Sequence, residues 1–165
     1  MRLARRPLTL ALALTAASAA ASAAPLRAQG RPVAVIGGVR ALSFGDVLPG
    51  VQTTVLATDP VRSGQFNITG QKFAEVEAWL TLPTQMTGPA GASIPLAFGP
   101  GSAGQSNTGA ITDQIAVDPR TRFTLTLSGN GRGFVYLGGS LLPAVQQPAG
   151  PYSATITLTV AYTGL

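Results

Sequence analysis

Histidine and cysteine are both absent from this sequence of 165 residues, and charged residues make up only 10% of it. A serine or cysteine nucleophile would therefore lack an imidazole base, and a soft metal would lack thiolate and imidazole ligands. Disulfides cannot form, so the core must be held by packing and backbone pairing alone. These absences predict a protein that is not an enzyme and that uses neither a cofactor nor a metal ion.

Residues 1–28 have the pattern of a secretory signal peptide. Three arginines precede an apolar stretch rich in leucine and alanine, and small residues follow it. Cleavage after Ala24 fits this pattern, but we favour cleavage after Ala28. The stretch is barely long enough to span a bilayer and is mostly Ala and Ser. We therefore expect an exported protein of the periplasm, the extracellular space or the cell surface, with no stable membrane span after signal cleavage.

The formal net charge of +5 belongs mostly to this signal peptide. Removing residues 1–28 takes away four of the eleven basic residues, which leaves seven against six acidic residues and a net charge of about +1. Such a chain has no basic surplus to attract nucleic acid or an anionic membrane, so we expect neither as a partner. The 137 residues that remain, 29–165, are enough for one domain.

The end of the chain alternates between apolar and polar side chains. From Tyr152 to Tyr162 the even positions are apolar, and the odd ones are Ser or Thr except at Ala161. This period of two predicts an amphipathic strand. Other short runs, separated by Gly, Pro, Asn and Asp, bring the count to about eight to ten strands with no confident helix, which is typical of an all-β sandwich. The inward residues should include Phe66, Ile68, Phe123, Leu125, Ile156, Leu158 and Val160.

Three internal segments carry more specific predictions. Residues 72–82 fit both helical and strand spacing, and we interpret them as a strand because they lack a helix cap and run into a proline. Asn130-Gly131 lies between two alternating runs and predicts a β-hairpin. Residues 83–118 are rich in Gly and Pro, which predicts loops around two short strands near 93–98 and 110–117. Such loops are where binding variation would lie.

Trp79 is the one candidate contact residue. On a strand it falls on the face opposite Val76, Ala78 and Leu80, where it could form an exposed platform for a sugar or a partner. The alternative, which we favour, is a second buried layer under a loop. Glu75 and Glu77 also share a strand face, and we expect them to be solvated carboxylates on a sheet edge rather than a glycosidase pair.

Five short motifs along the chain carry a family resemblance. They are Leu42-Ser43-Phe44-Gly45, Phe66-Asn67-Ile68-Thr69-Gly70, Tyr136-Leu137-Gly138-Gly139-Ser140-Leu141, Gln147-Pro148-Ala149-Gly150-Pro151-Tyr152 and Val160-Ala161-Tyr162. Together they resemble the bacterial family called domain of unknown function 4402, over most of residues 33–163. Residues 83–118 contribute no motif to this resemblance.

The closing pattern, an Ala-Gly-x-Tyr turn that leads into an alternating strand, is similar to subunits of chaperone–usher pili and to related spore-coat-U-like secreted domains. That similarity implies an immunoglobulin-like antiparallel sandwich that a partner could complete by donating a strand. The two resemblances together imply that Gly138, Gly139, Gly150, Tyr152 and Tyr162 form a structural motif. The chain differs from such subunits in lacking the disulfide that they often carry.

These observations lead to two functional hypotheses. The first is a secreted, non-enzymatic structural or adhesive module of the bacterial cell surface, similar to a pilus subunit, whose partner is itself or another surface subunit that pairs through an edge strand. The second is a monomeric periplasmic or extracellular domain that binds a glycan or a peptide in its Gly-rich loops or at Trp79.

Overall fold

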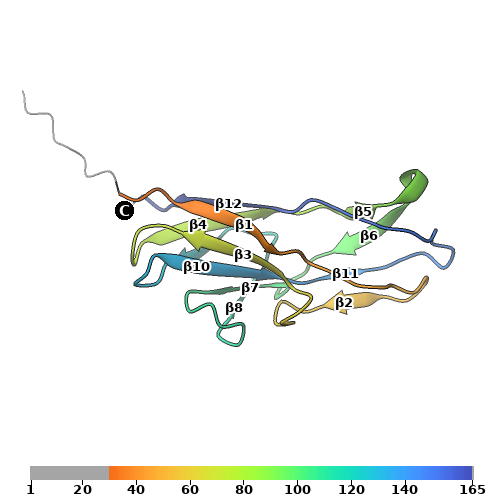
Figure 1. Cartoon of the computed structure of the whole chain (residues 1–165), viewed down its shortest axis with the longest axis horizontal. Helices are drawn as coiled ribbons and strands as arrows, with labels where there is room; N and C mark the ends of the chain where they lie inside the picture. Colours follow the sequence, from red (N-terminus) through yellow and green to blue (C-terminus); the bar gives the residue numbers. More distant parts are fainter. Residues whose placement is uncertain (1–29, 165) are drawn as a thin grey trace, which may run out of the picture.

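The computed structural model describes residues 30–164, so the expected signal peptide, residues 1–28, lies outside the described residues. The described part is all-β, with twelve strands, one 3-10 turn (Pro89–Gly91) and no α-helix (Figure 1). The strands are β1 (Ala34–Arg40), β2 (Thr53–Val55), β3 (Gly64–Thr69), β4 (Glu75–Thr81), β5 (Gln85–Thr87), β6 (Ser93–Ala97), β7 (Ala103–Ser106), β8 (Ile115–Val117), β9 (Phe123–Thr126), β10 (Arg132–Leu137), β11 (Gly139–Leu141) and β12 (Thr157–Tyr162).

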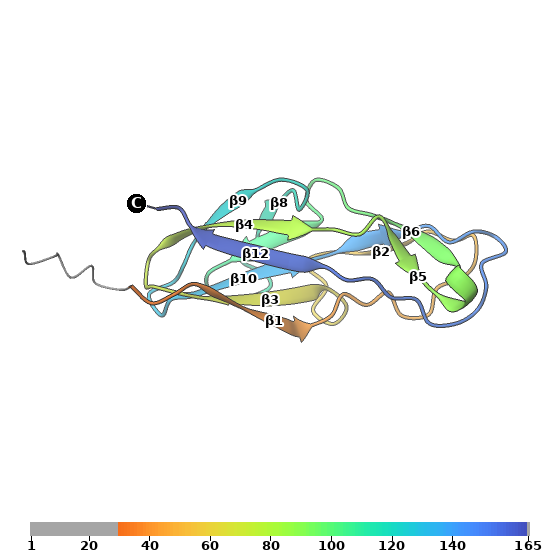
Figure 2. The ribbon, with the colours of Figure 1, turned by 90° about the horizontal axis from the view of Figure 1, so that it is seen from above.

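The strands form a β-sandwich with an extension at one end. A sheet in the order β1-β3-β10-β7-β8 packs against a sheet in the order β12-β4-β9, and all pairings are antiparallel. A third sheet, β2-β11-β6-β5, prolongs the first, because β11 follows β10 after one residue. Figures 1 and 2 show an elongated molecule. We call the end where β1 starts and β12 finishes the proximal end, and the end with the third sheet the distal end.

The main core lies between the first two sheets and comes from alternating side chains. In β4, for example, Val76 and Ala78 are fully buried, whereas Glu75 is exposed. Burial of each large apolar side chain of this kind stabilises the fold by about 1.5–3 kcal/mol. The buried members of the main core are Ile68, Val76, Ala78, Leu125, Leu127, Val135 and Leu158.

A second, smaller core lies in the distal part. Its buried members are Phe44, Val55, Ile94, Leu96 and Leu141. Phe44 does not belong to a strand, because it lies in the irregular connection between β1 and β2. Irregular chain therefore replaces a facing sheet on one side of this second core.

The sandwich predicted from the sequence is confirmed, with more strands than the eight to ten expected. Residues 72–82 do contain a strand, β4, and the register shift of β1 between Ile36 and Arg40 matches the glycine pair between them. The added strands β5 and β7 lie in the region where loops were expected. β7 has the sequence AGQS, which has no apolar alternation, and it is a strand because β10 and β8 pair with it on both sides.

The hairpin predicted at Asn130-Gly131 is wrong. β9 pairs with β4, and β10 pairs with β3 and β7, so this loop carries the chain from one sheet to the other. A type I′ turn needs a positive φ at both central residues, and of these two only Gly131 has one, at 68°. Burial explains the difference: Leu125 and Leu127 lie across the core from β10, where a Cβ on Gly133 would come within 2.6 and 2.9 Å of their methyl groups.

The predicted inward residues are confirmed with one exception. Ile68, Leu125 and Leu158 belong to the main core, and Phe66, Phe123 and Val160 pack against it. Ile156 is only half-buried and is outside this cluster, because the last strand starts at Thr157 rather than at Tyr152. Before that point, only Ser153 makes a β-bridge, with Thr87.

The position of Leu158 gives a direct test of the main core. Its side chain is 7% exposed, so Leu158→Asp removes about 2 kcal/mol of apolar burial and also places a carboxylate among apolar side chains. We expect the variant to be unfolded at room temperature by circular dichroism. Thr157→Asp, one residue earlier on the exposed face, should keep the wild-type melting temperature within a few degrees. A folded Leu158→Asp variant would contradict this assignment of the core.

Candidate functional site

One side of the sandwich is open along β1 and β12. These two strands are the edges of their sheets and lie side by side (Figures 1 and 2). No backbone hydrogen bond joins them in residues 30–164. Only half-buried side chains, Val33, Val35, Val160 and Tyr162, close the core between them. We call this feature the β1/β12 edge. It retains free backbone N–H and C=O groups on both strands.

The free groups of β12 follow from its pairing with β4. Thr163 donates its backbone N–H to Glu75 O at 3.3 Å, and hydrogen-bonded positions alternate along an antiparallel strand. The backbone groups of Leu158, Val160 and Tyr162 therefore point away from β4, toward the open side. Their side chains point into the core. An added strand could use these backbone groups without displacing any core side chain.

On the other side of the sandwich the chain itself connects the two edge strands at one end. β8 and β9 are the edge strands there, and a short turn, residues 118–122, joins them. Asp118 accepts hydrogen bonds from the backbone N of Arg120 at 3.0 Å and from its guanidinium at 2.7 and 2.9 Å. The side-chain hydrogen bonds of Arg120, followed by the backbone one, lower the pKa of Asp118 to about 2. The two sides of the sandwich thus differ in how firmly they are held.

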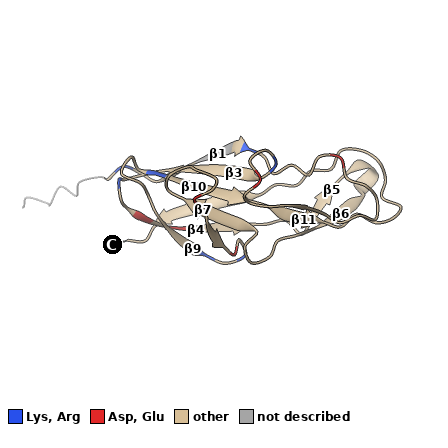
Figure 3. Cartoon of the chain, turned by 90° about the horizontal axis from the view of Figure 1, so that it is seen from below, with Lys and Arg blue, Asp and Glu red and all other residues tan. Residues whose placement is uncertain are grey.

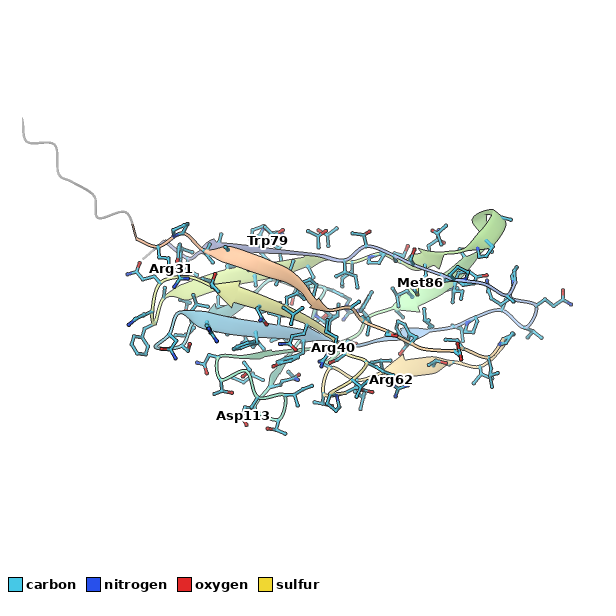
Figure 4. The ribbon with its side chains drawn as sticks, viewed as in Figure 1. Arg31, Arg40, Arg62, Trp79, Met86 and Asp113 are labelled. Carbon is cyan, nitrogen blue, oxygen red and sulfur yellow. The ribbon has the colours of Figure 1, made fainter. Side chains whose placement is uncertain are left out.

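At its distal end the open side widens into an apolar groove of about 510 Å³, which we call the distal groove. One wall is residues 42–49, which follow β1, and the other is residues 147–152, which precede β12. Met86, Ile94 and Leu141, from β5, β6 and β11, line it between these walls. Figure 4 shows Met86 among the strands of the distal part. The groove is therefore continuous in the chain with the two edge strands.

The polar side-chain atoms of Gln147 and Tyr152 in the groove wall are already engaged. The Gln147 amide donates to Tyr152 Oη at 2.7 Å and to Ser93 O at 3.3 Å, and its Oε1 accepts from Ala144 N. The Tyr152 hydroxyl donates to Pro148 O at 2.8 Å. Asp46 is the only charged residue in the lining, and it is exposed. The groove thus has a mixed lining, in which mainly apolar side chains alternate with polar groups and a single carboxylate.

Tyr162 holds the proximal end of the β1/β12 edge together. Its hydroxyl donates to Arg31 O at 2.5 Å and accepts from Gln71 N at 2.8 Å. These bonds tie the last strand to the segment before β1 and to the loop after β3. Figure 4 shows Arg31 at this end. Tyr162 and Tyr152 therefore hold opposite ends of the same side of the molecule.

The glycines of the predicted motif lie in two places. Gly138 separates β10 from β11, and a Cβ there would collide with the backbone of β2 and of the residues that follow it, so a side chain cannot fit. Gly139 begins β11, next to the ring of Phe98. Gly150 lies in a wall of the distal groove, against the ring of Pro89. The structure thus brings Gly150 and Tyr152 together at the groove and leaves Gly138, Gly139 and Tyr162 elsewhere.

Trp79 is neither a free platform nor a layer under a loop. It is half-buried on the outer face of β4, and the Arg122 guanidinium lies over its ring, 4.3 Å from the centroid. Arg122 also forms an ion pair with Glu77 at 2.5 Å. β4 is the central strand of its sheet, so Glu75 and Glu77 do not lie on a sheet edge as expected. A guanidinium already occupies the face on which a sugar would stack.

Residues 30–164 offer neither a metal-binding cluster nor a membrane-spanning helix. Their Asp and Glu residues form no group of three or more that could hold a metal ion. No helix in this part of the chain is long and apolar enough to cross a membrane.

The distal groove was missed by the analysis of the sequence. Its lining residues Phe44, Met86 and Ile94 come from three separate segments, none of which has a long alternating pattern. The Leu42-Ser43-Phe44-Gly45 motif pointed to one wall, and the motif that ends at Tyr152 pointed to the other. Nothing in the sequence indicated that the two walls would face each other.

Comparison with known protein families gives one match. The model of a family described as "Domain of unknown function (DUF4402)" matches residues 33–162. The matched span runs from just before β1 to the end of β12, so it includes the β1/β12 edge and the distal groove. No curated protein matches the chain.

The Tyr152 hydroxyl gives a test of the groove walls. Tyr152→Phe removes the donor to Pro148 and the acceptor for Gln147, so we expect a loss of about 1–2 kcal/mol in the free energy of unfolding. Urea denaturation measures it. Tyr162→Phe should cost a similar amount, because its hydroxyl also makes two bonds. A neutral effect of both changes would mean that these hydroxyls do not hold the two ends.

The lowered pKa of Asp118 predicts an acid-sensitive turn. A carboxyl whose pKa is lowered on folding stabilises the folded state above its ordinary pKa of 3.8, and this contribution disappears as the pH falls toward about 2. Asp59, whose pKa is lowered chiefly by the backbone N–H of Arg62, adds in the same direction. We therefore expect the urea midpoint to fall between pH 4 and pH 2. Asp118→Asn should make that fall shallower, and an equally steep fall would contradict the assignment.

Proposed function

The chain belongs to the family described as domain of unknown function (DUF4402), and from this premise we propose that it is a secreted, non-enzymatic structural or adhesive module of the bacterial cell surface. In this role it associates with a second copy or with another surface subunit through the β1/β12 edge. The similarity to pilus subunits stays a prediction within the same proposal.

The observation that carries this proposal is a structural difference between the two sides of the sandwich. A hydrogen-bonded turn joins the edge strands β8 and β9 on one side, whereas no short connection joins β1 and β12 on the other, and their open edges flank a half-buried apolar layer. Exposed strand edges favour pairing with another chain, and proteins that stay monomeric usually protect them with charges, prolines or covering loops. β12 has no charged residue and no proline. A partner strand is the covering that fits this edge.

The distal groove adds to this argument. An extended partner that pairs with β12 would run along the open side, and its apolar side chains could enter the groove between residues 42–49 and 147–152. Backbone pairing would then supply affinity, and the groove would supply selectivity for apolar side chains.

The groove also favours a second candidate function, the binding of a peptide by a monomeric domain. Its volume and apolar walls suit a short extended peptide or another small apolar ligand. Trp79 supports this alternative less, because Arg122 already lies over its ring. The two functions differ in whether the purified protein assembles at all.

Lysines introduced beside the open edge test the proposal. Thr155→Lys combined with Thr157→Lys places one charge just before β12 and one at its first residue, on exposed positions that the fold should tolerate. We expect the dissociation constant for assembly, measured by sedimentation velocity on the exported protein, to rise at least about tenfold. The matched control, Thr124→Lys with Thr126→Lys on β9, carries the same charges at the β8/β9 side and should assemble as the wild type does.

Equal assembly of the edge variant and the wild type would contradict pairing through β12. A wild-type protein that stays monomeric at high concentration, and whose tryptophan fluorescence changes when a peptide or a glycan is added, would favour the second function instead.

A further inference from the structure

The proximal and distal ends carry complementary features, and we propose that they bind each other: Phe73 of one copy enters the distal groove of a second copy. This inference rests on the proposed structural role and adds an end-to-end contact to the lateral one. It names a second copy of this chain as the occupant of the groove.

Phe73 is held in solvent at a conformational cost. It lies in the loop between β3 and β4, its side chain is 74% exposed, and its φ of 57° is in the left-handed region. A bulky residue without special backbone freedom rarely adopts this conformation, and strained positions concentrate at functional sites. The Phe73 backbone N donates to Ser128 O at 3.3 Å, and the ring leans toward Gly129. The loop thus presents an apolar ring instead of burying it.

The surroundings of Phe73 are mainly basic. Lys72 precedes it, Arg132 follows the adjoining loop, and Arg31 lies where Tyr162 ties the chain to Gln71. All three cationic residues are exposed. Glu75 is the acidic residue of this loop region, so the basic residues outnumber it.

The distal end is almost free of charge. Segments 41–55, 82–102 and 138–156, which build it, contain a single charged residue, Asp46. Figure 3 shows the same division, with most of the coloured residues away from the third sheet. Several large apolar side chains are exposed in these segments. They are Leu48, Val51, Leu142 and Val145. Loss of charged residues and exposure of apolar ones are typical of the centre of a protein interface.

The two ends fit in shape and in charge. The distal groove, at about 510 Å³, has room for a phenylalanine ring, and its walls offer Phe44, Tyr152 and the thioether of Met86. Aromatic rings and sulfur both make favourable contacts with such a ring. The carboxylate of Asp46 at the groove would face the basic surroundings of Phe73, with Lys72 next to it. Apolar insertion and opposite charge therefore favour the same docking.

This contact joins different surfaces of the two copies. Each copy keeps one free Phe73 and one free groove, so the contact does not close on itself by a twofold axis and can propagate along the molecule's long axis. The backbone groups of the β1/β12 edge stay available for lateral pairing, and Phe73 takes the place in the groove that side chains of a lateral partner could otherwise enter.

Removal of the Phe73 ring should weaken binding without destabilising the fold. Phe73→Gly takes away the inserted side chain and also relieves the left-handed backbone, so we expect its melting temperature to equal or exceed that of the wild type. In the Thr155→Lys, Thr157→Lys background, where lateral pairing is removed, the dissociation constant for self-association should rise at least about thirtyfold, as for the loss of a buried aromatic anchor. Val61→Gly, at another residue that is 75% exposed and outside both ends, is the matched control and should associate normally.

A mixing experiment tests the pairing of the two surfaces. Ala149→Trp fills the groove from an exposed wall position, and Ala116→Trp on β8 is its control. The ring and groove changes are made in the Thr155→Lys, Thr157→Lys variant, which removes lateral pairing. In that background Phe73→Gly and Ala149→Trp should each be monomeric alone, but an equimolar mixture should form dimers and nothing larger, because only one intact end surface remains on each chain. Asp46→Lys should weaken wild-type association at least about tenfold through like charges.

The outcomes distinguish this contact from lateral pairing. If the Thr155→Lys, Thr157→Lys variant loses assembly while Phe73→Gly retains it, the lateral proposal stands and the end-to-end contact is overturned. The reverse result supports the end-to-end contact alone. A mixture that stays monomeric, or a wild-type chain that never associates, overturns it as well.

Discussion

Burial of apolar side chains between the two facing sheets is the interaction on which the rest of the structure depends. The chain has no disulfide, and no group of three or more acidic residues in the described part could bind a metal, so Ile68, Leu125, Val135 and Leu158 and their neighbours must hold the sheets together. That burial also determines where the chain can cross between the layers. Three crossings, at residues 70–74, 118–122 and 127–131, lie in short loops, and none of them joins the β1 and β12 edges.

The distal part follows a different principle. There, irregular chain covers the second core, and the covering segments are rich in proline and glycine and almost free of charge. Such segments do not form the continuous backbone ladder of a sheet, so isolated backbone bonds, as between Thr87 and Ser153, and single side chains such as Tyr152 and Gln147 hold them in place. An incompletely covered apolar core is what creates the groove. The opening is thus a consequence of how this end is built, and the same feature makes it suitable for a partner.

The sequence predicted those parts of the fold in which a strand carries its own alternation. In β12 and β4 the alternation of apolar and polar residues identifies the inner face of the strand. The predicted inner residues, Leu158 and Val160 in β12 and Val76 and Ala78 in β4, are the ones observed in the core. The prediction from the sequence failed where pairing with neighbouring strands determines the structure. β7 is a strand only because its neighbours pair with it, and Asn130-Gly131 joins two sheets because burial outweighs the preference of a local turn. The groove could not be predicted, since it arises from the mutual placement of two irregular segments.

β1 and β12 run antiparallel, so the start of the first strand and the end of the last strand lie at the same pole of the molecule, the proximal end. Tension applied between the two termini would therefore load the edge strands crosswise and peel them from β3 and β4 one hydrogen bond at a time. Tension between a terminus and the opposite pole would load the same ladders lengthwise, so that all their hydrogen bonds resist together. A module of this shape is mechanically strongest when it is pulled from pole to pole.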